Sequence, residues 1–337
     1  MAEAALSALI ANLSAARAVT PLDVLALRRL IYADGAIAPP EAEALIALDE
    51  AADGRCTEWD DLFVEALTDF IVRQQMPEGY VDDAKADWLI ARLGADGRIK
   101  TDSELELLVY ILETATTAPA RLAAFVLAQV KAAVVDGEGP LLRGARLEQG
   151  RINADEVTLL RRVLYAAGGD ANVAITRAEA EVLFDINDAC RGADNDASWT
   201  DLFVKALAAS VMTVSGFEPA SREDEARREA WLAQAEPSGL AGVAGFMSRM
   251  FAGSPSALTH PGRSLSSDGL DDWRALNERT EAAEAAAEII SDDEARWLAE
   301  RIGRDGQFDA AEHALIAFLK RESPNIHPAL KPLLDAA

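Results

Sequence analysis

The chain has 337 residues, half of them apolar, and a formal net charge of −25. This length allows one or two substantial hydrophobic cores. The acidic charge argues against nucleic acid as a direct partner, because phosphate binding needs clustered Lys and Arg, and it disfavours binding to anionic membrane surfaces. The charge is compatible with simple solubility, and if it serves binding, the expected partner is a basic protein or a cation.

Residues 1–18 are expected to form an N-terminal helix. The start of the chain lacks the basic residues and the apolar run of a signal peptide. The most apolar run, Leu122 to Val135, is too short to span a bilayer. Only Cys56 and Cys190 are present, which fits a reducing compartment. We therefore expect a cytoplasmic protein with no transmembrane segment.

A tight turn then joins two apolar helices between Asp34 and Glu41. Gly35 can supply the positive φ that ends a helix, and Ile37 can enter the core. Glu41 falls in the first turn of the next helix, at the positive end of its dipole. Similar turns lead to three later glutamates, each after a residue that can cap the helix: Asp96-Gly97 with Thr101 and Glu104, Gln149-Gly150 with Asn153 and Glu156, and Asp305-Gly306 with Asp309 and Glu312.

The turns have the spacing of a calcium loop from which most ligands are missing. If Glu41 were the last ligand, Leu30 and Tyr32 would stand at the first and third positions, which in such loops supply oxygen. Arg301 and Gly303 would stand there in the turn of Asp305. A capped helix turn is therefore favoured over a metal site at each turn.

The segments ADGAIAPPEAEALIAL (33–48) and ADGRIKTDSELELLVYIL (95–112) resemble the helix-turn-helix signature of the tellurite-resistance TerB-like proteins, an all-helical family with acidic turns. The resemblance covers four or five short segments. It implies a cytoplasmic, acidic, non-enzymatic protein linked to stress responses or membrane-associated complexes, with a divalent cation as the one cofactor to consider. Gln149 and Ser103 depart from the signature. When the acidic positions of the family are transferred to this sequence, the resemblance implies these candidate metal ligands: Asp34, Glu41, Asp96, Glu104, Asp305 and Glu312.

Four blocks of the first part of the chain recur in the same order further on, which predicts an internal duplication. The matches are Leu27–Ala33 with Leu160–Ala166 (shift 133), Glu41–Ile46 with Glu179–Phe184 (shift 138), Trp59–Leu67 with Trp199–Leu207 (shift 140), and Asp87–Gly94 with Arg296–Gly303 (shift 209). The jump of 209 − 140 = 69 residues predicts an insertion. We expect a duplicated all-α bundle with modules at 19–137 and 138–337, the second carrying a flexible insertion at about 222–290. The paired tryptophans are expected in the core.

The insertion contains a short amphipathic segment between Gly- and Ser-rich stretches. Its apolar residues fall on one helical face: Leu240, Val243, Phe246, Met247, Met250 and Phe251. Such a segment can dock into the groove of a protein partner, touch a membrane peripherally, or pack on its own bundle.

No catalytic constellation emerges from the sequence. None of the three histidines has another His or Cys at the spacing of metal ligands. The sequence also contains no nucleophile elbow, phosphate loop or dinucleotide fingerprint. The sequence therefore favours a non-enzymatic adaptor or regulatory protein that binds a protein partner. The alternative is a divalent-metal sensor or buffer of calcium type that uses the repeated acidic turns, and an acid-cluster hydrolase would need convergent groups that the sequence does not show.

Overall fold

The computed structural model describes residues 2–94, 97–140, 149–166, 175–212, 292–302, 304, 308–322 and 328–331. All of them belong to one compact unit, formed by Met1–Thr213 and Ile290–Ala337. The predicted insertion and its amphipathic segment, Leu240 to Phe251, lie outside the described residues.

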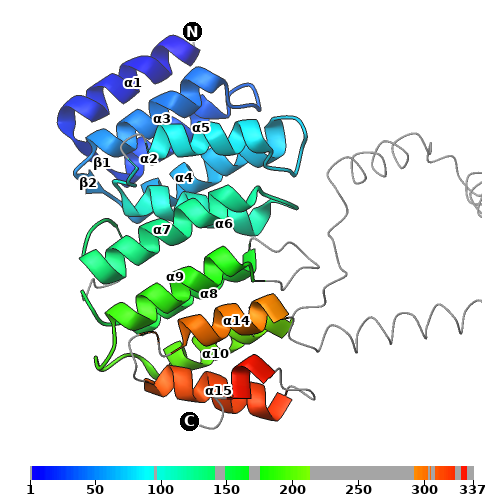
Figure 1. The fold of residues 1–337 in the computed structure, drawn as a ribbon. Coiled ribbons are helices and arrows are strands. Elements are labelled where there is room, and N and C mark those ends of the chain that lie inside the picture. Colours follow the sequence, from blue (N-terminus) through cyan, green and yellow to red (C-terminus); the bar gives the residue numbers. More distant parts are fainter. Residues whose placement is uncertain are drawn as a thin grey trace, which may run out of the picture. The chain divides into compact units, whose positions relative to one another are not determined.

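The described residues are mostly helical, which confirms the all-α prediction. Figure 1 shows the elements coloured along the sequence. The α-helices are α1 (Ala2–Ala16), α2 (Pro21–Ile31), α3 (Pro39–Ala51), α4 (Thr57–Thr68), α5 (Asp83–Leu93), α6 (Asp102–Thr114), α7 (Ala120–Asp136), α8 (Ala154–Ala166), α9 (Arg177–Ala189), α10 (Ala197–Met212), α14 (Asp292–Arg301) and α15 (Ala310–Glu322). A π-helix, η1 (Asp69–Gln74), continues α4, and a 3-10 turn, η4 (Pro328–Leu330), follows α15. Two parallel two-residue strands, β1 (Ala18–Val19) and β2 (Gly54–Arg55), precede α2 and α4.

The glycines of the repeated turns have the expected positive φ, but they do not end the preceding helices, because α2 and α5 already end at their C-caps, Tyr32 and Gly94, three residues earlier. Gly35, Gly97 and Gly150 have φ of 84°, 81° and 74°, values that favour glycine over any residue with a Cβ. The isoleucine two residues after each glycine is buried, as at Ile37 and Ile99. Each turn therefore places one apolar side chain in the core and leads into the next helix.

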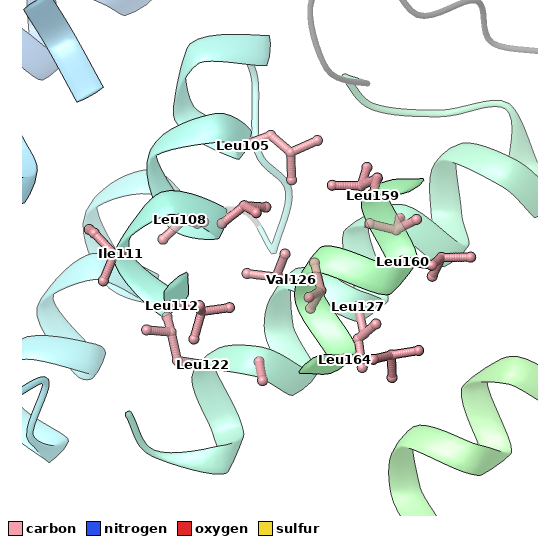
Figure 2. Packing of buried hydrophobic residues seen from close by; sticks show 14 of the residues in the cluster. Leu105, Leu108, Ile111, Leu112, Leu122, Val126, Leu127, Leu159, Leu160 and Leu164 are labelled. Carbon is pink, nitrogen blue, oxygen red and sulfur yellow. The ribbon is translucent and has the colours of Figure 1, made fainter. Parts of the chain in front are cut away.

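Helices α6, α7 and α8 pack around a shared apolar interior. Figure 2 shows ten labelled residues of this cluster, and each is at most 3% exposed: Leu105, Leu108, Ile111, Leu112, Leu122, Val126, Leu127, Leu159, Leu160 and Leu164. Their three- and four-residue spacing gives each helix one apolar face. The contacts of α6 and α7 with α8 and α9 join helices of both predicted modules in one core.

The C-terminal helices pack on helices that precede residue 213. Helix α15 lies along α10, which comes about 100 residues earlier (Figure 1). Trp59 and Trp199 are 0% and 2% exposed, which confirms the core prediction for both. Within the described part of the chain, no helix is both long and apolar enough to cross a membrane.

Candidate functional site

The glutamates of the repeated turns act as helix caps. In each case one carboxylate oxygen accepts a hydrogen bond from the backbone N–H three residues earlier, closing the N-terminus of its helix. The N–H to Oε2 distances are 2.8 Å for Glu41, 3.1 Å for Glu104, 2.8 Å for Glu156 and 3.0 Å for Glu312. In turn, the backbone N–H of the glutamate donates a hydrogen bond to the side-chain oxygen of Thr101, Asn153 or Asp309, as predicted. These capping oxygens are therefore already engaged in holding the turns.

The other candidate ligands do not gather into a metal centre in the described residues. Asp34 is exposed and bonds the backbone N–H of Ala36 over 3.3 Å. Asp96 and Asp305 lie outside the described residues. Among the residues that are described, no group of three or more His, Cys, Asp or Glu side chains could hold a metal ion. The metal hypothesis stays a prediction.

Glu104 differs from the other caps in its burial. Its side chain is fully buried, and no hydrogen-bond donor of the described residues reaches its second oxygen, Oε1. Burial raises the pKa of Glu104 above its ordinary value, the nearby charges of Asp49 and Glu50 add to the effect, and the backbone N–H groups of Lys100 and Thr101 oppose it. Glu104 is therefore a buried acid whose ionised form the fold disfavours.

This burial makes stability depend on pH. Because the pKa of Glu104 is raised in the folded state, its contribution to the free energy of unfolding is complete below the pKa of the unfolded state. That contribution is lost as the pH rises through the pKa of the folded state. The Glu104→Gln variant keeps an oxygen for the two N–H groups and removes the titration, so its stability relative to wild type should increase between pH 4 and pH 7. Urea unfolding at both pH values measures this, with Glu41→Gln, at a partly exposed cap, as the matched control. A relative stability that is flat or falls with pH would contradict the expectation.

A second buried acid, Asp49 on α3, organises the start of α4 and α6. It is 0% exposed and accepts hydrogen bonds from the Trp59 indole (2.7 Å), Arg55 (3.1 Å), the Thr101 hydroxyl (2.6 Å) and the Ser103 hydroxyl (2.8 Å). Arg55 also donates to Asp102 over 2.6 Å. Because Arg55 lies two residues before α4 and Asp102 begins α6, these bonds bring the N-terminal ends of the two helices together.

A groove of about 650 Å³ runs between α4 and α6. On α4 it follows one face from Thr57 to Thr68, which at 1.5 Å per residue is about 16 Å long. On α6 it follows the face from Asp102 to Tyr110. The groove therefore has the length of a short peptide segment, with η1 at one end and the Arg55 network at the other.

The lining of the groove is strongly acidic. Five carboxylate residues line it: Asp60, Asp61, Glu65, Asp102 and Glu106. Three of them bind arginines that lie outside the lining: Glu65 binds Arg28 (2.6 Å), Asp102 binds Arg55 (2.6 Å), and Glu106 binds Arg162 (2.7 Å). Asp61 is exposed, no hydrogen bond or ion pair within 4 Å joins it to a described residue, and its charge acts on the Arg28 guanidinium at longer range. The acids thus exceed the local cations, and at least one is available to a ligand.

Thr68 lies in the wall of the groove at the end of α4. Its residue is 1% exposed, and in the described part of the chain its hydroxyl has no hydrogen-bond partner. A buried hydroxyl without a partner costs free energy, since it has lost its water. The backbone changes from α-helix to π-helix directly after this residue, a step that is often found at functional sites. Thr68 therefore offers an unused polar group in the acidic groove.

No pattern in the sequence indicates this groove. Acids are so frequent in the chain that their spacing carries no information, and the groove depends on the pairing of two helices some 40 residues apart. The capping role of Glu104 did have a signal, because Thr101 and Glu104 form the Thr-x-x-Glu pattern of a capping box.

Comparison with known proteins finds no match, whether to a family model, a curated protein or a solved structure.

Proposed function

We propose that this chain is a non-enzymatic binding protein, an adaptor or regulatory module, that holds a basic segment of a protein partner in the groove between α4 and α6. The observation that carries the proposal is the acidic lining of that groove, together with the unsatisfied hydroxyl of Thr68. Carboxylates on two facing helices attract Lys and Arg side chains, and complementary charge speeds encounter and selects partners. Val64 and the partly exposed Tyr110 add apolar surface to the same walls.

The resemblance to TerB-like proteins supports an adaptor of stress-response or membrane-complex type, located in the cytoplasm. We also propose the internal duplication, with an insertion in the second copy. Matched ion pairs support it: Arg92 bonds Glu43 and Glu50, and Arg301 bonds Glu181 and Asp188. The acids are related by the shift of 138 and the arginines by the shift of 209. The Trp59 indole donates to Asp49, and the Trp199 indole donates to Asn187, which is again a shift of 138 between the acceptors.

The proposal is tested by binding of a lysine-rich peptide with a fluorescent label, followed by anisotropy at low ionic strength. Reversing the charge of Asp61, in Asp61→Lys, should weaken binding several-fold, because a lysine would then repel the peptide from the acidic end of the groove. The control is Asp194→Lys, which makes the same change in net charge at a side chain that is 98% exposed in a distant loop.

The control variant should bind as tightly as wild type, apart from the small effect of net charge. Equal weakening by both variants would show that the peptide responds to overall charge, and it would remove the groove from the proposal. The segment from Leu240 to Phe251 stays a second predicted contact for a protein partner.

A further inference from the structure

The groove has an uneven distribution of charge along its length. Asp60, Asp61 and Asp102 lie toward the N-terminal ends of α4 and α6. Arg73, from η1, lies toward the other end with Tyr110, and it alone is cationic among the described residues that line the groove. Glu65 and Glu106, which also line the groove, are paired with Arg28 and Arg162. One end of the groove therefore presents carboxylates, and the other presents a guanidinium that is paired with Asp69.

Arg73 keeps the capacity to bind a ligand. One of its terminal nitrogens, Nη1, donates to Asp69 over 2.5 Å, while the side chain is 55% exposed. A guanidinium carries five N–H donors and suits a carboxylate. Asp69 is 17% exposed and also accepts a hydrogen bond from the Tyr32 hydroxyl over 2.9 Å, which fixes the acid that holds Arg73. Arg73 is thus held in place at the groove with donors to spare.

We infer that the groove selects a partner segment with ordered charges, with Lys or Arg side chains at the Asp60 and Asp61 end and a carboxylate at Arg73. Thr68, between the two ends, supplies its buried hydroxyl to a polar group of the segment. This inference rests on the proposed function and specifies the partner. Asp102 and Tyr110 are eight residues apart on α6, about 12 Å, so an extended partner places its opposite charges about four residues apart at 3.3 Å per residue.

The inference and attraction by net charge alone predict opposite changes in peptide affinity when one negative charge is removed from the peptide. The protein carries −25 charges, so removing a negative charge from a basic peptide should strengthen binding if only net charge matters. If the carboxylate contacts Arg73, the same removal should weaken binding.

Two capped, labelled peptides that differ at one residue test it. Both contain three lysines and an Ala-Ser-Ala spacer, followed by glutamate in one and glutamine in the other. The glutamate peptide should bind wild type several-fold more tightly than the glutamine peptide. In the Arg73→Gln variant the preference should vanish or invert. Arg121→Gln serves as the matched control, because Arg121 is an exposed arginine that pairs with Asp83 and Asp87 outside the groove.

Equal or tighter binding of the glutamine peptide to wild type would overturn the inference, and so would a preference that survives Arg73→Gln. In those cases binding that still depends on Asp61 would leave the proposed function standing. Failure of both peptides to bind would overturn the inference and the proposed function together.

Discussion

Replacing Asp49 with alanine is expected to lower the free energy of unfolding by about 3–5 kcal/mol, the cost of breaking a buried, hydrogen-bonded charge pair. Asp49 is fully buried and accepts bonds from four side chains on α4, on α6 and just before them. Without it, the Trp59 indole and two hydroxyls lose their acceptor in the core. Domains commonly have only 5–15 kcal/mol of stability, so this one side chain accounts for a large fraction. Urea unfolding followed by circular dichroism measures the loss.

The Asp49→Asn variant is the matched control. The chain itself shows that an asparagine can serve an indole in this arrangement, since Asn187 accepts from Trp199 over 3.0 Å. Asparagine keeps the acceptor for the indole and loses the charge that faces Arg55. The free energy of unfolding of Asp49→Asn should therefore lie between that of wild type and that of Asp49→Ala. If alanine cost less than about 1 kcal/mol, the typical value of a single hydrogen bond, Asp49 would not be the centre that holds α3, α4 and α6 together.

Replacing Arg301 with alanine is expected to lower the free energy of unfolding by about 3 kcal/mol. Arg301 is 4% exposed, and its guanidinium binds Glu181 (3.0 Å), Asp185 (2.7 Å) and Asp188 (2.7 Å) while lying over the ring of Phe184. Its removal leaves three acids of α9 facing one another and takes away the packing of the arginine stem. Thermal or urea unfolding reports the change.

Arg92→Ala is the control, because Arg92 makes the corresponding bonds to Glu43 and Glu50 on α3 from a side chain that is 26% exposed. A more exposed pair contributes less, about 1 kcal/mol or below. Equal losses for the two variants would show that burial does not set the strength of these pairs. A loss at Arg301 that disappears in high salt would point to surface electrostatics instead.

Local features of the fold could be predicted from the sequence because they depend on neighbouring residues. The positive φ of Gly35 and Gly97, the burial of Ile37 and the N-cap of Thr101 each follow from a few consecutive side chains. The helical periodicity of α6 likewise places its leucines in the core. Such signals are local, and the structure confirms them.

The candidate site depended on contacts between distant residues. The groove forms because Arg55 and Asp49 hold the start of α6 beside α4, and the partners are about 50 residues apart. The change of α4 into a π-helix after Thr68 has no sequence signature that we can identify. The resemblance made the turn acids candidate metal ligands, which stays a prediction, while the residues of each turn favoured helix caps, and the described oxygens of Glu41, Glu104 and Glu312 do cap helices. Only the packed structure shows which acids face an open groove.

Amide hydrogen exchange of the full chain, with and without a saturating lysine-rich peptide, tests the binding proposal most directly. Binding in the groove should slow exchange in residues 57–73 and 102–110, because a ligand that contacts both helices stabilises them against local opening. Asp61→Lys should remove this protection. Protection that appears only in other helices, or the same protection in Asp61→Lys as in wild type, would contradict the groove between α4 and α6 as the partner site.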